Sequence, residues 1–467
     1  MPIVRVIDSV VFFLLLSVIV LTIVPYGTAE SWWEALFECV IFGITAVWVL
    51  KVLLAGKWEV GKLGLALPLV CLTLFAFAQI VVWPAWLTPS ALHLSSQHTL
   101  TIDRYQTYLT ARKILALTVF FSLLLLHTST PSRLRWLVRT IIGLGLASAI
   151  FGILRQLLQS PDSPTGFVLP FLFYKLGYGQ FISHNDFAYL MEMTLGVIGG
   201  LLLGRGISRD RILICLSLIV PVWTALVLSE SRGGVLSFVC ETIFLTMVSL
   251  SWYSRRNLDG SEGAKRNILA FLQGSIVVRI LVVGLMICTL LVGVFWMGGE
   301  SFSARVQLMD TADPELGMTR RDVWQSGWQL IKHNPWTGTG FGTFYLAIPE
   351  YQKGTGTIRV EQAHQDYLDL AVNGGAVAVA LAAWFLIMVF RGARVSLKSA
   401  DAYRRAAALG ATAGILSVCF HSFVDFGLQL TGIAVVFGAL IVIAVADDRL
   451  VSAVKPKRRP SLVITER

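Results

Sequence analysis

Charged residues are scarce in this chain of 467 residues: they make up only 14% of it, whereas hydrophobic residues make up 55%. Soluble globular proteins usually carry about 25% charged residues, so the composition excludes an ordinary soluble domain. Mean hydropathy is +0.72, and apolar runs of about 18 residues, enough to cross a bilayer as helices, recur along the chain. An outer-membrane barrel would show short alternating segments instead. The sequence therefore predicts an all-α polytopic membrane protein.

Several signatures of soluble enzymes and metal sites are also missing. There is no Walker-type phosphate loop, and the GTGFG run at 338–342 does not follow a strand of a βαβ unit. No internal repeat of about 20–50 residues is visible. The six cysteines fall inside apolar stretches, and neither they nor the histidines show metal-binding spacing. Any chemistry is therefore expected at the membrane, carried by helices and outer loops.

Hydropathy predicts about 12 transmembrane helices. The expected spans are 7–25, 34–54, 63–83, 110–127, 136–157, 185–204, 211–229, 234–252, 274–297, 367–390, 406–424 and 428–446. Basic residues cluster in every second connection between these spans, among them Lys51, Arg133, Arg209, Arg255, Arg391 and Arg405. This alternation follows the positive-inside rule. Both termini are therefore predicted in the cytoplasm, the net charge of +10 is explained by topology, and nucleic-acid binding is not expected.

The connections on the opposite, outer side include long loops, and loops of such length are usually functional. The largest is 298–366, a loop before the tenth helix that is expected to face the periplasm or the cell exterior. We divide the chain into 1–183 (the first five helices), 184–446 (the remaining helices with the large outer loop) and 447–467 (a basic cytoplasmic tail).

The segment SESRGG places Arg232 between two apolar spans on the outer side. An arginine at this depth is costly without a partner, and glycines next to it let the backbone approach a ligand closely. A guanidinium grips phosphate through two parallel hydrogen bonds. We interpret Arg232, supported by Ser231, as part of an anion site for a phosphate group. The alternative is an arginine that caps a helix, snorkels to the interface or pairs with Glu230.

The large outer loop is predicted to contain a helix over 320–331, followed by a flexible glycine turn at 338–342. Arg320 and Arg321 stand at the start of this helix, where positive charge opposes the helix dipole. A bound anion near that end would offset the unfavourable charge. The alternative is a salt bridge with Asp322 or Glu315 on a solvated face.

His364 lies where the outer loop re-enters the membrane, followed by Asp366 and Tyr367. Histidine is the side chain whose unperturbed pKa lies closest to neutrality, which suits proton abstraction from a hydroxyl. We interpret His364 as a candidate base with Asp366 and Tyr367 in support. The alternative is a structural histidine.

Smaller polar features complete the outer face. His184 and Asn185 open the sixth span, and Asp425 lies with His421 near the last outer turn. Each is expected to cap a helix or to form an interhelical hydrogen bond, with Asn185 or Asp186 as the N-cap of the sixth span. A supporting role in a site is the alternative.

Taken together, four segments resemble the O-antigen ligase and O-antigen polymerase superfamily of membrane glycosyltransferases. In order, they are HNDFAYLMEM at 184–193, SRGG at 231–234, TRRDVWQSGWQLIKHNPWTGTGFGTF at 319–344 and AHQDYLDLAVNGG at 363–375. The resemblance is most specific over about 184–430 and implies a GT-C-like helical enzyme, with 184–446 as its catalytic transmembrane region. By the family pattern, the functional positions fall on Arg232, Arg320 with Arg321 adjacent, and His364.

The resemblance implies a donor glycan carried on undecaprenyl diphosphate. Two arginines aimed at the departing diphosphate can stabilise its charge without a metal. His364 would take the proton of an acceptor hydroxyl, and a single displacement would invert the anomeric carbon. Metal-dependent oligosaccharyltransferases of related architecture place acidic residues in the first outer loop, which here offers only Glu30. No divalent ion and no cofactor are therefore expected.

The residues leave two transfer activities open. A ligase moves the glycan onto a lipid A–core acceptor, and an O-antigen or exopolysaccharide polymerase moves it onto another lipid-linked glycan; we favour the ligase. The resemblance places the enzyme among the lipids of a bacterial inner membrane, with its site facing the periplasm. A polysaccharide transporter is the competing hypothesis, but it predicts polar residues at the midplane, whereas the sequence suggests charges gathered at the outer face.

Overall fold

The computed structural model is helical throughout the part of the chain that it describes. The described residues are 2–56, 63–84, 98–159, 177–258, 284, 320–351 and 360–446. They form no β-strand, only an isolated bridge between Tyr178 and Phe181. The helices are α1 (Pro2–Ile23), α2 (Ser31–Ala55), α3 (Leu67–Ile80), α4 (Arg104–His127), α5 (Pro131–Leu158), α6 (His184–Leu203), α7 (Ile212–Leu228), α8 (Arg232–Leu258), α11 (Arg320–His333), α12 (Phe344–Ala347), α13 (Asp366–Ser396), α14 (Ala402–His421) and α15 (Thr431–Val445). The all-α prediction is confirmed.

The helices coincide with the predicted membrane spans wherever the structure describes them. Eight described helices are long and apolar enough to cross a membrane, and α7 and α15 are shorter apolar helices. Together with α14, they account for every predicted span except the ninth. That span, 274–297, lies outside the described residues apart from residue 284. The multi-pass architecture is therefore confirmed, while the count of about 12 stays a prediction.

One end of the bundle brings predicted cytoplasmic connections together, and we call it the basic end. There Asp8 of α1 lies 2.5 Å from the Nζ of Lys51, at the end of α2, and 2.6 Å from Arg133, at the start of α5. Two cation–π contacts extend this end to α14 and α8: Arg135 lies over the ring of Tyr403 and Arg405 over that of Trp252, at 5.6 and 5.7 Å. Connections far apart in sequence thus share one side, as the alternation of basic clusters requires.

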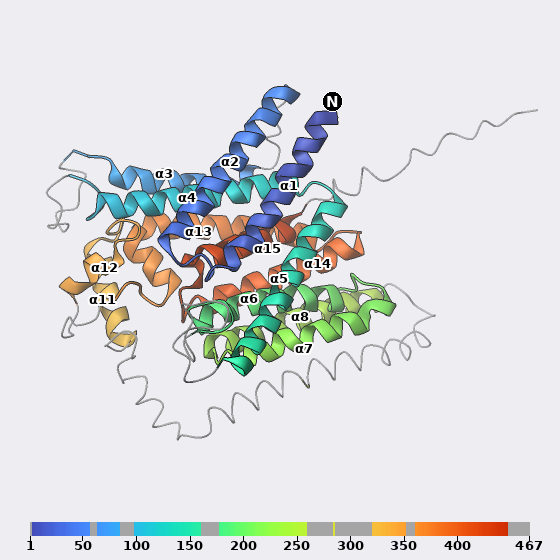
Figure 1. Cartoon of the computed structure of the whole chain (residues 1–467). Helices are drawn as coiled ribbons and strands as arrows, with labels where there is room; N and C mark the ends of the chain where they lie inside the picture. Colours follow the sequence, from blue (N-terminus) through green and yellow to red (C-terminus); the bar gives the residue numbers. More distant parts are fainter. Residues whose placement is uncertain are drawn as a thin grey trace, which may run out of the picture.

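The opposite end, which we call the site end, holds the outer motifs. In Figure 1 the N-terminus of α1 lies at the upper right, whereas α11 and α12 lie at the far left. Helix α8 ends at the basic end, but α11 begins at the site end, where Nη1 of Arg320 donates a hydrogen bond to the carbonyl of Val424 (3.0 Å). The described residues on either side of the predicted ninth span therefore lie at opposite ends of the bundle.

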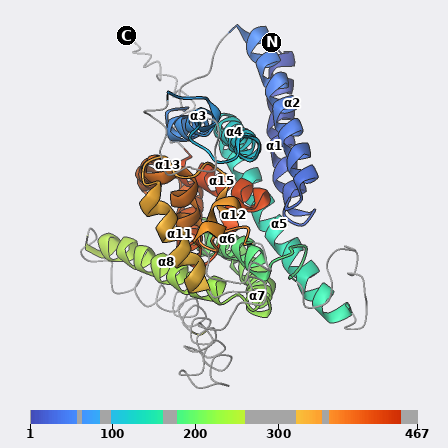
Figure 2. The same cartoon turned by 90° about the vertical axis from the view of Figure 1, so that its left-hand side faces the viewer.

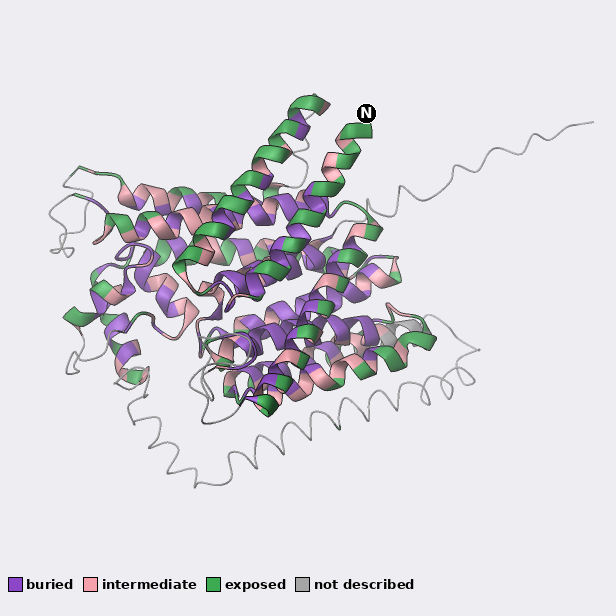
Figure 3. Ribbon diagram, viewed as in Figure 1, coloured by how far each residue is buried: buried purple, intermediate pink, exposed green. Residues whose placement is uncertain are grey.

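Helices α6 and α14 share the most extensive contact between two helices of the described chain, and α8 and α15 pack against both. Figure 2 shows α6 in the interior, between α15 and α7. Helices α6 and α14 approach closely because each carries two glycines four residues apart on the facing side. A Cβ at Gly196 would lie 2.9 Å from the backbone nitrogen of Gly414, and one at Gly410 would lie 2.5 Å from the carbonyl oxygen of Gly196. Small residues at this spacing are what lets membrane helices pack backbone to backbone. Burial is highest in α6, α14 and α15, whereas α1 and α2 remain largely exposed, as lipid-facing helices would be (Figure 3).

Helix α13 breaks at Gly375, whose φ of 58° lies in the left-handed region. The break divides the predicted tenth span into a short N-terminal helix and a longer apolar helix. The N–H groups freed by the break are satisfied by the chain that follows α11: Ala376 donates to Pro335 (2.8 Å) and Val377 donates to Trp336 (3.2 Å). Irregular backbone at the membrane is tolerated where protein supplies the missing partners, and here the outer loop does so.

The glycine turn at 338–342 is held in place, so the prediction that it is flexible is wrong. The side chain of Gln79, in α3, is fully buried and forms hydrogen bonds to this turn. Its Nε2 donates to the carbonyls of Thr337 (2.8 Å) and Asn373 (3.1 Å), and its Oε1 accepts from the N–H of Phe341 (3.0 Å). One amide thus ties the turn and the outer part of α13 to the N-terminal helices, a long-range contact that local composition does not reveal.

Replacing this amide tests how much the turn depends on it. We expect Gln79→Ala to lower the free energy of unfolding in detergent by about 3 kcal/mol, since each buried backbone group left without a partner costs about 1–3 kcal/mol. Thermal unfolding of the purified protein measures the change. Gln325→Ala, on the exposed side of α11, is the matched control and should stay within about 0.5 kcal/mol of the parent. Equal stability of the two variants would show that the turn is held by other contacts.

Candidate active site

The segment 421–426, directly after α14, is the point on which the outer motifs converge. Helix α14 ends at His421, and the chain turns back on itself through hydrogen bonds from the N–H groups of Val424 (2.9 Å) and Asp425 (3.1 Å) to the carbonyl of His421. This turn, which we call the hub turn, leads through a short 3-10 helix at Gly427–Gln429 into α15.

The SRGG motif forms the N-terminus of α8 against the hub turn. Ser231 is fully buried, accepts a hydrogen bond from the N–H of Gly234 (3.1 Å) and donates one to Oδ1 of Asn185 in α6 (2.7 Å). It thus caps α8 in the manner usual for a serine before a helix. A Cβ at Gly233 would lie 3.0 Å from a methyl group of Val424. Two residues predicted as supporting, Ser231 and Asn185, are therefore in direct contact.

Arg232 is the first residue of α8, and its side chain is exposed. Within the part of the chain that the structure describes, its guanidinium forms no hydrogen bond or ion pair, and it does not pair with Glu230. Glu230 itself has a φ of 62°, a left-handed conformation that costs energy in a residue other than glycine and often marks functional sites. The arginine therefore stands beside the positive end of a helix dipole, where an anion is favoured.

Helix α11 brings a second arginine to the hub turn. Arg320 is half-buried and bonded to Val424 through the 3.0 Å hydrogen bond described above, whereas its neighbour Arg321 is exposed. The indole N–H of Trp324 donates to the carbonyl of Ala363 (3.0 Å) and so fixes α11 beside the candidate base. Of the two arginines between which the sequence did not decide, Arg320 is therefore the one directed toward the hub turn.

His364 contacts the same turn from the start of α13. Its ring meets that of Phe426 edge to face, with centroids 4.6 Å apart, and its backbone adopts a left-handed φ of 49°. The N–H of Asp366 is within 3.1 Å of the carbonyls of both Ser422 and Asp425. A strained backbone held by contacts on both sides is a common feature of catalytic segments.

Other predicted supporting residues anchor α13. Oδ2 of Asp366 accepts hydrogen bonds from the hydroxyl of Ser422 (2.7 Å) and from the N–H of Leu428 (3.3 Å), and the hydroxyl of Tyr367 donates to the carbonyl of Cys419 (2.8 Å). Both side chains thus dock the helix that follows His364 onto α14 and the hub turn.

The remaining supporting residues occupy the edge of this region. Asp425 is buried in the hub turn, and its carboxylate lies close enough to Asp186 of α6 to interact with it electrostatically. His184 is exposed at the first position of α6. The expected N-cap at Asn185 or Asp186 is wrong: the cap is Ser183, whose hydroxyl accepts from the N–H of Asn185 (3.2 Å).

Two carboxylates inside the bundle were missed from the sequence. Glu192 of α6 and Glu241 of α8 are buried within apolar helices, so the expectation that charged residues gather only at the outer face is wrong. An acidic residue within an otherwise apolar span was the signal that could have found them, because intramembrane carboxylates are costly and usually have a function.

No group of three or more His, Cys, Asp or Glu side chains within the described residues has an arrangement suited to a metal ion.

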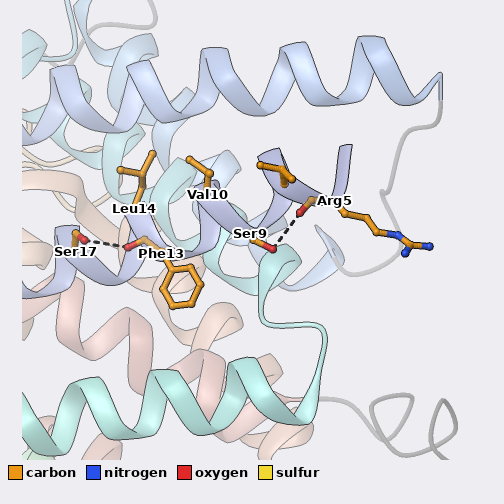
Figure 4. A pocket seen from close by; sticks show the side chains of 7 residues that line it. Arg5, Ser9, Val10, Phe13, Leu14 and Ser17 are labelled. Atoms are coloured by element: carbon orange, nitrogen blue, oxygen red, sulfur yellow. Dashed lines mark hydrogen bonds between the residues drawn. The ribbon is translucent and has the colours of Figure 1, made fainter. Parts of the chain in front are cut away.

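Away from the motifs, a groove of about 530 Å³ runs along the surface of α1 from Arg5 to Ser17 (Figure 4). The hydroxyls of Ser9 and Ser17 that line it donate to carbonyls of their own helix. The groove is open and mostly apolar, consistent with a surface facing lipid, and none of its residues belongs to the outer motifs.

Comparison with known proteins supports the interpretation of the motifs. Residues 216–383 match a protein-family model described as O-antigen ligase, and no curated protein matches the chain. The matched region runs from α7 into α13 and contains Arg232, Arg320 and His364. The resemblance stated from the sequence is therefore confirmed: residues 216–383 are similar to the O-antigen ligase family, which supports membership of the O-antigen ligase and polymerase family.

Proposed function

We propose that the protein transfers a glycan from an undecaprenyl-diphosphate donor to an acceptor hydroxyl, with inversion at the anomeric carbon. The observation that carries this proposal is the convergence of the three motif segments on one turn. Arg320 binds the carbonyl of Val424, Gly233 beside Arg232 lies against the side chain of Val424, and His364 packs on Phe426. Three segments that carry two arginines and a histidine thus meet at one short turn at the site end.

In this reaction the acceptor oxygen forms a bond to the anomeric carbon while the bond from that carbon to the diphosphate oxygen breaks. The electron pair of the broken bond leaves with undecaprenyl diphosphate. Arg232 and Arg320 bind the departing diphosphate, and the developing charge is stabilised where the α8 dipole also favours an anion. His364 accepts the proton of the acceptor hydroxyl. We propose that this chemistry proceeds without a metal ion and at the periplasmic face of a bacterial inner membrane.

The proposed acceptor is lipid A–core, as in an O-antigen ligase. The polymerase alternative uses the same chemistry with a second lipid-linked glycan as the acceptor, so the fate of the glycan in a deletion strain separates the two. Full-length polymer that stays unlinked indicates a ligase, and single repeats on the core indicate a polymerase. A transporter would release no undecaprenyl diphosphate from purified donor and acceptor.

The role of His364 predicts a loss of activity that is not a loss of fold. We expect His364→Asn to reduce the transfer rate by about 100-fold or more, because asparagine accepts the left-handed backbone but cannot take up the proton. The measurement is release of undecaprenyl diphosphate by purified protein given lipid-linked glycan and acceptor. His333→Ala, an exposed histidine at the end of α11, is the control. Near-parental activity of His364→Asn would refute the assignment of the base.

If Arg232 clamps the diphosphate, a positive charge at position 232 without the shape of a guanidinium is insufficient for transfer. We expect Arg232→Lys to lower the transfer rate by about 100-fold, because an ammonium lacks the fork that binds two phosphate oxygens at once. Arg139→Lys, at an exposed position in α5, should retain parental activity in the same assay. If lysine serves as well as arginine at position 232, Arg232 does not clamp the diphosphate.

The proposed orientation is tested by cysteine labelling in a variant whose native cysteines have all been replaced. Gln325→Cys, at an exposed position of α11, should react in intact spheroplasts with a maleimide that does not cross membranes. Ser132→Cys, exposed at the start of α5, should react only after permeabilisation, since the basic end is predicted to face the cytoplasm. The reverse pattern would place the site on the cytosolic side.

A further inference from the structure

A buried hydrogen bond between a histidine and a carboxylate joins the first residue of the hub turn to α6. Nδ1 of His421 is 2.6 Å from Oε1 of Glu192, and both side chains are fully buried. The other carboxylate oxygen of Glu192 accepts a hydrogen bond from Ser417 (2.7 Å). Glu192 lies eight residues into α6, about 12 Å from its outer end. Placing two ionisable groups here costs desolvation energy, which is recovered only with good geometry and further hydrogen bonds.

The imidazole of His421 is held on several sides. Its ring stacks on that of Tyr189, with centroids 4.0 Å apart and planes within 9°. Nδ1 is engaged by the carboxylate of Glu192, so Nε2 is the ring nitrogen that remains for other contacts. Nε2 is buried and has no hydrogen-bond partner among the described residues.

Nε2 faces the N-terminus of α8. A Cβ at Gly233 would lie 2.5 Å from Nε2 of His421, and one at Gly234 would lie 3.2 Å from Oε1 of Glu192. Both glycines of the SRGG motif are therefore needed for α8 to begin against this pair.

The same pair is connected to the second arginine. Three residues after His421, the carbonyl of Val424 accepts the hydrogen bond from Arg320, and the N–H of Val424 donates to the carbonyl of His421 (2.9 Å). The pair thus fixes one turn that contacts both the start of α8 and the start of α11.

We propose that Glu192 and His421 are positioning residues that set the geometry between Arg232 and Arg320. The inference rests on the proposed transferase function and deepens it: the buried pair anchors the hub turn to α6 so that both guanidinium groups meet one diphosphate. Neither Glu192 nor His421 reaches the substrate, and both act through Arg232 and Arg320.

A double-mutant cycle between His421 and Arg232 tests this inference. The assay measures release of undecaprenyl diphosphate from the lipid-linked glycan made by the protein's own host cell. His421→Ala should lower kcat by about 10- to 100-fold, because displacing a catalytic group by about 1 Å can lower the rate about 10²-fold. In the Arg232→Lys background, His421→Ala should lower kcat by less than about threefold further. The guanidinium whose position His421 supports is already absent from that variant, so the two effects should not add. Rates are normalised to the folded fraction measured by size-exclusion chromatography in detergent.

A steric variant probes the same contact from the side of α8. Gly233→Ala places a Cβ against Nε2 of His421 and should lower kcat about as much as His421→Ala does. The double variant Gly233→Ala/His421→Ala should be no slower than the slower single variant, because removing the ring removes the clash. The inference is overturned if, in both double-mutant cycles, the loss of kcat in the double variant equals the product of the losses in the two single variants.

The matched control is His127→Ala, which removes a histidine of similar burial at the basic end. Its effect on kcat should multiply with that of Arg232→Lys. Failure of the inference is distinct from failure of the proposed function: a parent protein that releases no undecaprenyl diphosphate contradicts the transferase. An active parent whose His421→Ala variant is equally active contradicts only the positioning role.

Discussion

The backbone-to-backbone packing of α6 against α14 is the contact on which the rest of the site depends. Without a hydrophobic driving force between helices in lipid, close association relies on dispersion contacts and hydrogen bonds, and both require small residues at the interface. The glycines of the two helices provide that approach. It places Glu192 opposite His421 and fixes the level at which α14 ends. The position of the hub turn follows from it.

The site around that turn is assembled from segments that are far apart in the chain. Helix α8 supplies Arg232, the outer loop supplies Arg320, and the broken start of α13 supplies His364, while α3 holds the glycine turn through Gln79. Each segment satisfies backbone or side-chain polar groups of another, as buried polar groups require. The N-terminal helices therefore contribute directly to the placement of the motifs, although their sequence resembles only generic apolar helices.

Polar groups inside the bundle are concentrated near the proposed site. Glu192, Ser417 and His421 form a connected set beneath it. Such residues are expensive in a membrane, so their presence so near the motifs fits a functional use. They also remove one reason for rejecting a transporter, which was the expected absence of polar residues at depth. The case for a transferase now rests on the convergence of the motifs and on the match of residues 216–383 to the O-antigen ligase family model.

The sequence by itself determined the helical class, the positions of eleven of the described helices and the residues that belong to the motifs. These follow from properties that are local: hydropathy over about 20 residues, the alternation of basic connections, and short ordered motifs. Tertiary structure alone decided which arginine faces the hub turn, that Gln79 holds the glycine turn, that α13 breaks at Gly375 and that Glu192 meets His421. Each of these depends on contacts between residues separated by dozens to hundreds of positions, and no local pattern encodes which of those residues will meet.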